Sequence, residues 1–150
     1  MIPRSCLPFA LAILLMGCVR APAAGVEHVV LPDVARLPAF SHATIAGHFV
    51  FVSGTLGTRP ASLELVAGGV GPETAQALRN VTEILGAAGS SPSDITRCTV
   101  YLADLADFDA MNAAWRGVFP TKPPARTTVG VAALVLAARV ELECTAASRR

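Results

Sequence analysis

The sequence predicts an α+β fold, in which a single domain has one mixed β-sheet with two helices on one of its faces. Three observations support this prediction. Several short segments alternate apolar and polar residues, as β-strands do. Two longer segments instead repeat apolar residues at helical spacing. The segments follow one another as strands, helix, strand, helix and two strands, and two helices can cover only one face of such a sheet.

The composition agrees with one folded domain. Hydrophobic residues make up 53% of the 150 residues and charged residues 15%, which argues against a disordered chain. The formal net charge is +1 and the basic residues form no run, so nucleic-acid binding is not expected. Lys122 is the only lysine, and a Schiff-base mechanism would depend on this one residue in a proline-flanked loop.

Residues 1–17 are predicted to be an export signal. Arg4 supplies the positive start, and the apolar run 7–16 is too short to span a bilayer. The run ends in Leu-Met-Gly-Cys, which resembles the bacterial lipobox, so Cys18 is expected to be lipidated in a periplasmic, membrane-anchored lipoprotein. The alternatives are cleavage within 21–24, which would give a soluble periplasmic protein, and a buried apolar segment of the fold.

Four short segments before residue 70 have the composition of strands. They are 28–31, 44–46, 49–53 and 63–66. The second and third form a hairpin that turns at Gly47-His48, and Gly54 is expected to end the third. Residues 18–36 are predicted to comprise a linker and the first short strand, and residues 37–147 are predicted to form the main domain.

Two helices are predicted. Pro72 and Glu73 suit the first turn of one helix, and Gly89 is expected to end it. The other helix begins near Asp107 and ends before Pro120. Their apolar stripes consist of Leu78, Val81, Leu85 and Ala88, and of Phe108, Met111, Trp115 and Val118.

Three further strands are predicted at 95–102, 127–133 and 139–146. The last strand alternates apolar residues with Glu141, Glu143 and Thr145, so one of its faces carries two carboxylates. The sheet face that the helices leave open would include three aromatic residues, Phe49, Phe51 and Tyr101. Because this face is too apolar for water, a second subunit is expected to cover it.

Two cysteines, Cys98 and Cys144, lie in predicted strands of the domain. They could pair in an oxidising compartment, but a disulfide needs Cα atoms within about 7 Å, a distance that the sequence does not fix. Two separately buried thiols are therefore expected.

Five segments together resemble the reactive intermediate deaminase family, often called RidA or YjgF. They are FVFVSG at 49–54, QALRNVTEILGAAGSS at 76–91, TVYLADLADFDAMNAAW at 99–115, PPARTTVGVAAL at 123–134 and VELECTA at 140–146. The resemblance covers about residues 38–147. It implies a chorismate-mutase-like fold that assembles as a homotrimer with ligand clefts between subunits. It also implies hydrolysis of small 2-imino or 2-enamino acids to 2-keto acids and ammonia, without a metal or an organic cofactor.

The same resemblance assigns roles to individual residues. Arg126 matches the essential arginine, whose planar guanidinium can hold a substrate carboxylate through two hydrogen bonds. Glu141 matches the acid that positions the attacking water and accepts its proton. The substrate-binding positions are Phe40, Ser53, Gly54, Asn112 and Thr128. Residue type alone would also fit an interface salt bridge for Arg126 and a structural role for Glu141.

The chain departs from the family pattern in two places. Phe40 stands where many deaminating members have the tyrosine of Gly-Pro-Tyr, so the phenol hydroxyl is absent. The loop usually written Pro-Lys-Gly reads Val135-Leu136-Ala137, which is more apolar. An exported deaminase would also need a source of imines outside the cytoplasm. The alternative function is therefore a non-catalytic small-carboxylate-binding protein that uses the same cleft, and a ribonuclease is disfavoured by the charge and the lack of paired histidines.

Overall fold

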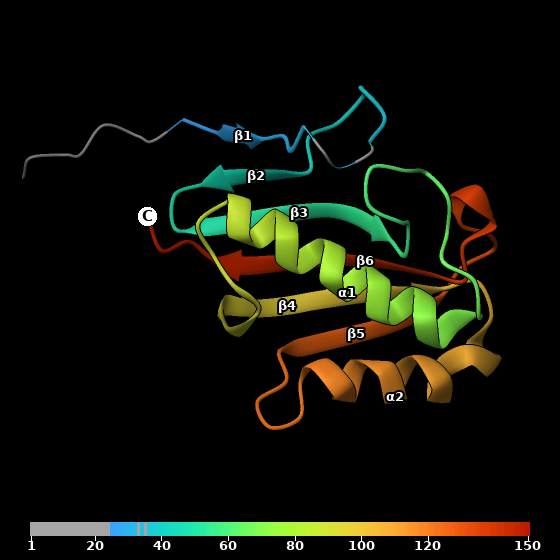
Figure 1. Cartoon of the computed structure of the whole chain (residues 1–150). Helices are drawn as coiled ribbons and strands as arrows, with labels where there is room; N and C mark the ends of the chain where they lie inside the picture. The colour runs from blue at the N-terminus through green and yellow to red at the C-terminus, as the bar shows by residue number, and fades with distance from the viewer. Residues whose placement is uncertain (1–24, 33, 35) are drawn as a thin grey trace, which may run out of the picture.

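The fold was determined as a computed structural model, which describes residues 25–32, 34 and 36–150. It is a mixed sheet of six strands in the order β1-β2-β3-β6-β4-β5, with two helices on the same face (Figure 1). The predicted α+β class is thereby confirmed. Cys18 and the predicted export signal lie outside the described residues. In the part of the chain that is described, no helix has the length and apolar character needed to cross a membrane.

The elements follow the predicted order. The strands are β1 (Glu27–Val29), β2 (Ala43–Ala46), β3 (Phe49–Leu56), β4 (Ile95–Leu102), β5 (Ala125–Gly130) and β6 (Val140–Ala147). The helices are α1 (Val70–Ala87) and α2 (Phe108–Val118), and short 3-10 turns occupy Pro92–Asp94, Leu105–Asp107 and Val135–Ala137. Strands β4 and β5 pair in parallel, and the other neighbours pair antiparallel.

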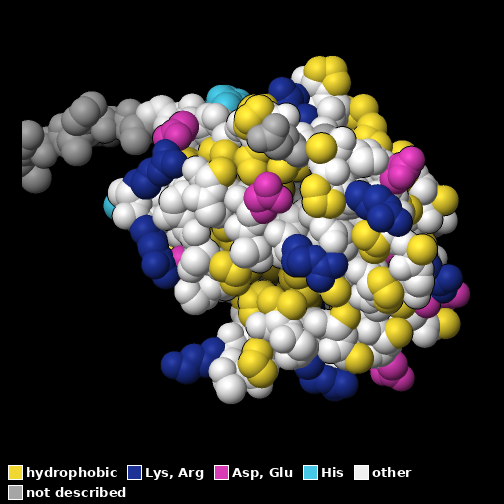
Figure 2. All heavy atoms as spheres, in the orientation of Figure 1, with side chains coloured by type: hydrophobic (Ala, Val, Ile, Leu, Met, Phe, Trp, Pro, Cys, Tyr) yellow, Lys and Arg dark blue, Asp and Glu magenta, His cyan; other side chains and the backbone are white. Residues whose placement is uncertain are grey.

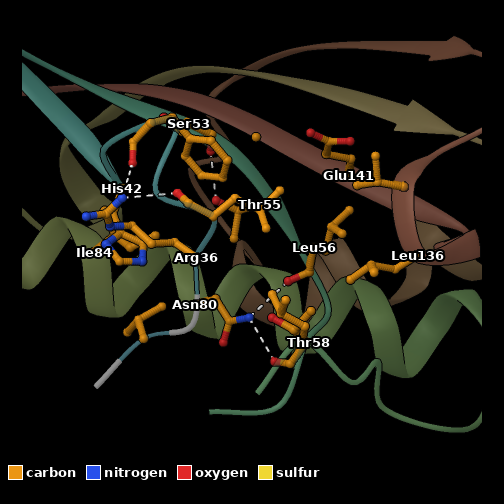
Figure 3. Close-up of a pocket in the computed structure, with 16 residues that line it drawn as sticks. Arg36, His42, Ser53, Thr55, Leu56, Thr58, Asn80, Ile84, Leu136 and Glu141 are labelled. Carbon is orange, nitrogen blue, oxygen red and sulfur yellow. Dashed lines mark hydrogen bonds between the residues drawn. The ribbon is translucent and has the colours of Figure 1, made fainter. Parts of the chain in front are cut away.

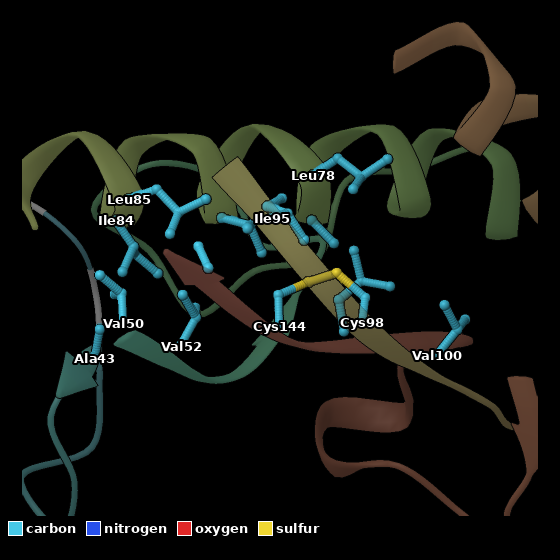
Figure 4. Close-up of a cluster of buried hydrophobic side chains, with 14 of the residues drawn as sticks. Ala43, Val50, Val52, Leu78, Ile84, Leu85, Ile95, Cys98, Val100 and Cys144 are labelled. Atoms are coloured by element: carbon cyan, nitrogen blue, oxygen red, sulfur yellow. A yellow bond between two sulfur atoms is a disulfide. The ribbon is translucent and has the colours of Figure 1, made fainter. Parts of the chain in front are cut away.

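The core lies between the sheet and the helices (Figure 4). Helix α1 buries its whole predicted stripe, and the apolar face of β6 is buried as expected. Helix α2 buries only Met111 and Trp115, whereas Phe108 and Val118 are 39% and 40% exposed. The predicted α2 stripe is too wide because this helix lies beside β5, the last strand of the sheet, and its outer flank has no further strand beneath it.

The opposite face of the sheet carries exposed aromatic residues. Phe49 and Phe51 are 47% and 45% exposed, and their ring centroids are 6.3 Å apart. Tyr101 donates a hydrogen bond of 2.8 Å to Glu143 on the neighbouring strand β6. Neighbouring exposed aromatic side chains of this kind are often found where another protein surface is bound.

Three strand predictions were wrong in detail. Gly54 does not end β3, because a bulge between Val52 and Thr55 absorbs the irregularity and β3 continues its pairing with β6. Residues 63–66 form no strand, and Leu65 makes only an isolated bridge with Thr58. Strand β5 spans Ala125–Gly130 and not 127–133, because only these residues pair in register with β4.

The two core cysteines form a disulfide, which corrects the expectation of separate thiols. Cys98 and Cys144 lie directly opposite each other on β4 and β6, with their Cα atoms 4.1 Å apart (Figure 4). Each is 1% exposed, so the disulfide is part of the core. The pairing depends on the register of two strands that are far apart in the sequence, which local patterns do not encode.

Reduction of this disulfide is expected to lower the stability of the domain. The cysteines are 46 residues apart, and closing a loop of this size restricts the unfolded chain enough to stabilise the fold by about 4 kcal/mol. We expect reductant to lower the midpoint of thermal unfolding by about 10–15 °C. The double variant C98A/C144A serves as the control, because its midpoint should not respond to reductant. A wild-type midpoint that is the same with and without reductant would contradict the prediction.

Candidate active site

Arg126 lies on the helix face of β5. Its strand partner is Cys98, which points into the core, and directly paired residues of neighbouring strands point to the same face. The Nη2 of Arg126 donates a hydrogen bond of 2.8 Å to Oδ1 of Asn112, and its Nη1 lies 3.8 Å from the Sδ of Met111. The guanidinium carbon also lies 5.0 Å from the ring centroid of Trp115. Helix α2 therefore fixes the direction of this side chain.

The charge of Arg126 has no counter-ion among the described residues. The ion pairs found there use Arg139, Arg149 and Arg150 instead. Partial burial lowers the pKa of Arg126, although a guanidinium remains protonated in proteins. A partly desolvated cation that is oriented but not neutralised is suited to bind an anion.

Thr128 is the next inward-facing residue of β5. It pairs with Val100, so its side chain shares the face of Arg126. Its Oγ1 is buried and has no hydrogen-bond partner in the described part of the chain. Leaving such a group unsatisfied costs about 1–3 kcal/mol. A polar ligand beside Arg126 would satisfy it, and we refer to Arg126, Asn112 and Thr128 as the arginine half-site.

Glu141 lies on the other face of the sheet. Its partner on β4 is Tyr101, and the core residues Val140 and Leu142 flank it on the helix side. The carboxylate lines a cavity of about 430 Å³ together with Phe40, Ser53 and Gly54 (Figure 3). Partial burial, and then the charge of Glu143, raise the pKa of the Glu141 carboxyl. These four cavity residues, Phe40, Ser53, Gly54 and Glu141, are called the glutamate half-site below.

The β3 bulge positions the glutamate half-site. Ser53 and Gly54 lie within the bulge, and bulges often redirect side chains next to functional sites. The hydroxyl of Ser53 donates a hydrogen bond of 2.8 Å to the carbonyl of Ser41, which attaches the loop before β2 to the strand. In the same loop, Arg36 donates to the carbonyl of Phe40 at 2.8 Å. The phenyl ring therefore belongs to a loop that is fixed at two points.

Two further residues that line this cavity, Arg36 and Asn80, were not predicted from the sequence. Asn80 on α1 donates hydrogen bonds of 2.9 and 3.0 Å to the carbonyls of Leu56 and Thr58 (Figure 3). These bonds hold the end of β3 against the helix. Asn80 is 8% exposed, and its position beside the apolar stripe of α1 is a signal that could have marked it. Arg36 gives no such signal, because it bonds only to carbonyl groups of its own loop.

Substitution of Gly54 by alanine is expected to displace the Glu141 carboxylate. A Cβ at position 54 would overlap Oε1 of Glu141, the movable end of a side chain, so the strand itself can stay in place. We expect a loss of at least tenfold in the activity proposed below, with an unfolding midpoint close to that of the wild type. Gly86→Ala is the matched control, because a Cβ there meets no atom within 4 Å. Full activity of Gly54→Ala would show that the position of the carboxylate is not critical.

The two half-sites cannot meet on one small ligand within a single chain, because Arg126 points to the helix face and Glu141 to the opposite face. The predicted site residues thus form two groups. A ligand that contacts both needs a second copy of the chain. Among the described residues, no three histidine, cysteine or carboxylate side chains gather in a way that could hold a metal ion.

The fold and the half-sites define a small α+β protein that has an oriented anion anchor and a separate partly buried carboxylate. Comparison with known proteins places it more closely, since residues 33–148 match the family model described as Endoribonuclease L-PSP. The chain belongs to this family, which is the RidA/YjgF family.

Its relatives include proteins named as deaminases. The chain is 44% identical over 112 residues to Reactive Intermediate Deaminase A, chloroplastic, of Arabidopsis thaliana, an alignment that covers 75% of this chain and 60% of the relative. It is 43% identical over 118 residues to the 2-iminobutanoate/2-iminopropanoate deaminase of Capra hircus, covering 76% of this chain and 86% of the relative. The crystal structure of yeast Mmf1 superposes with a TM-score of 0.78 at 31% identity, covering 83% of this chain and all of that one (100%).

Proposed function

We propose that this protein hydrolyses small 2-imino acids, or their 2-enamino tautomers, to 2-keto acids and ammonia. The observation that carries the proposal is the oriented guanidinium of Arg126, which has no counter-ion in the described part of the chain and lies beside the unsatisfied Thr128 hydroxyl. A 2-imino acid brings a carboxylate to such an anchor. The relatives from Arabidopsis thaliana and Capra hircus are named as deaminases of this kind, which supports the same reaction class.

The proposed active unit is a homotrimer with shared sites. The arginine half-site of one subunit would face the glutamate half-site of the next, which accounts for their placement on opposite faces of one chain. The exposed Phe49 and Phe51 support contact between subunits on the open sheet face. Such an arrangement would enclose the substrate between the two half-sites and exclude bulk water.

The proposed reaction needs only an anchor and a base. With the substrate carboxylate held by Arg126, a water beside Glu141 attacks C2, and the C=N π electrons move to nitrogen as the C–O bond forms. Glu141 accepts a proton from the water and passes it to nitrogen, which gives a carbinolamine. A second proton then moves from the hydroxyl to nitrogen, the C–N bond breaks, ammonia leaves and the oxygen becomes the keto group.

Purified mature protein tests this proposal directly. An L-amino-acid oxidase with catalase generates 2-iminopropanoate from alanine, and the lifetime of the imine is measured with and without the protein. We expect wild-type protein to shorten this lifetime in proportion to its concentration. An unchanged lifetime at micromolar protein would overturn the proposal.

The alternative is a non-catalytic carboxylate-binding protein, and Phe40 is the observation that favours it. This residue lines the Glu141 cavity without the hydroxyl that could bind water or substrate. In this case keto acids would raise the unfolding temperature of the wild type but not of an Arg126 variant, while the imine lifetime stays unchanged. The family description also names a ribonuclease, but basic side chains are interspersed with acidic ones on the face shown in Figure 2, unlike the basic surfaces that bind nucleic acids.

We also propose that the protein is exported to the periplasm and anchored through a lipid on Cys18. The Cys98–Cys144 disulfide supports export, because disulfides persist mainly in oxidising compartments. The mass of the mature protein distinguishes a lipidated Cys18 from a soluble product that begins within residues 21–24. An unmodified chain recovered from the cytoplasm would overturn both parts of this proposal.

A further inference from the structure

The cavity beside Glu141 has a wall of apolar side chains. Figure 3 shows Leu136 at the same end of the cavity as Glu141, and Leu56 of β3 lines it too. Leu63, from the loop after β3, Val135 and Phe40 also line the cavity. At about 430 Å³ the cavity lies within the size range of small-molecule sites, and a three-carbon imino acid would fill only a small part of it.

Leu136 adopts a backbone conformation that leucine normally avoids. Its φ is 58° and its ψ is 17°, and Ala137 follows with a φ of 55°. The left-handed region costs a residue with a Cβ roughly 1–2 kcal/mol, whereas glycine enters it freely. Because Leu136 is 48% exposed, burial in the core of its own chain does not offset this cost. The side chain is therefore held beside the cavity at a position where the backbone favours glycine.

Two residues that follow Leu136, Ala138 and Arg139, fix the short turn Val135–Ala137 in place. Ala138 is 1% exposed, and the backbone N–H of Arg139 donates a hydrogen bond of 2.8 Å to the buried Glu73. The Arg139 guanidinium makes two hydrogen bonds of 2.7 Å to Asp107. A strained backbone conformation persists when the surrounding contacts impose it. Residues held in this way often cluster at ligand sites.

We propose that this cavity binds the aliphatic side chain of the imino acid, and that Leu136 determines the preference for branched side chains of four or more carbons. The inference rests on the proposed deaminase function and narrows its substrate class. The carboxylate of Glu141 and the apolar wall line one cavity, so a substrate whose C2 lies beside the carboxylate directs its side chain along the wall. Each methylene that gains such a contact changes kcat/KM by about tenfold or more.

The test compares 2-iminopropanoate with 2-imino-4-methylpentanoate, generated by the oxidase from alanine and leucine. We expect wild-type kcat/KM to be at least tenfold higher for the leucine-derived imine. Leu136→Gly should reduce this ratio about tenfold, mainly through a loss of kcat/KM for the leucine-derived imine, which loses its contact with the leucine side chain. Glycine suits the backbone at this position, so the variant is expected to fold. Val118→Ala, which trims a 40% exposed side chain on α2, is the control and should keep the wild-type ratio.

The possible failures can be distinguished. Equal kcat/KM for the two imines, or an unchanged ratio in Leu136→Gly, would overturn the specificity inference while the deaminase function stands. If wild-type protein accelerates neither imine, the deaminase function fails, and thermal shifts with pyruvate and 4-methyl-2-oxopentanoate decide the inference. A larger shift with the longer keto acid that is lost in Leu136→Gly supports it. Equal shifts, as expected if a neighbouring subunit already fills the cavity, overturn it.

Discussion

Substitution of Arg126 by alanine is expected to lower kcat/KM for 2-iminopropanoate by about 10²–10⁴-fold. A guanidinium can make two charge-assisted hydrogen bonds to the substrate carboxylate, each contributing about 1.5–3 kcal/mol. Asn112 and the Trp115 ring hold this guanidinium in one direction before substrate arrives, so little orientation is left to be gained on binding. The measurement is the imine lifetime assay, with the uncatalysed rate subtracted.

Two further variants separate anchoring from folding. Arg126→Lys keeps the charge and loses the planar fork, so we expect a substantial loss that is smaller than that of Arg126→Ala. Because Arg126 has no ion-pair partner in the described chain, neither variant should lower the unfolding midpoint by more than a few degrees. Arg116→Ala, an exposed arginine on α2, is the matched control and should retain wild-type activity. Near-normal activity of Arg126→Ala would exclude the anchor role.

Substitution of Glu141 by glutamine is expected to lower kcat by about 10²–10⁴-fold, the range of general acid–base catalysis. Glutamine retains the shape of the side chain but cannot accept a proton from water. Substrate binding through Arg126 should persist, so KM is expected to change much less than kcat. Glu64→Gln, an exposed carboxylate in the loop after β3, controls for the loss of one negative charge. A KM effect without a kcat effect would assign Glu141 to binding instead.

The pH dependence gives an independent test of the same base. Burial and the charge of Glu143 raise the pKa of Glu141, so the active carboxylate form is lost at a higher pH than for an ordinary glutamate as pH falls. The acid limb of the kcat/KM profile should reflect this raised pKa. In Glu143→Gln the repelling charge is gone, which lowers the pKa of Glu141 and should move the acid limb to lower pH. If the acid limb of the kcat/KM profile does not move in Glu143→Gln, the titrating group is not Glu141.

Local patterns predicted most of the elements. The strand at 95–102 and the stripe of α1 were correct because each is amphipathic in its own sequence, and the packing follows that pattern. The Gly47-His48 turn was also correct, since turn chemistry is local. The width of the α2 stripe was wrong, because exposure of Phe108 depends on the position of the helix at the end of the sheet.

The sequence selected candidate site residues one by one, but it did not predict how they are arranged in space. The resemblance to the family selected Arg126 and Glu141. It did not indicate that the two charged residues lie on opposite faces of one sheet, which depends on the pairing of β4 with both β5 and β6. The left-handed Leu136 was also missed, because nothing in the sequence requires a leucine to enter that region.

The disulfide also determines how the chain would respond to a break in its backbone. The cysteines at 98 and 144 enclose Asn112, Arg126, Thr128 and Glu141, so the residues with the main chemical roles belong to one covalent ring. Lys122, the only lysine, lies exposed between α2 and β5 within this ring. A protease that cuts on the amino-terminal side of lysine, at the Thr121–Lys122 bond, would open the ring without releasing a fragment. Each half-site would then stay covalently attached to the rest of the molecule until the disulfide is reduced.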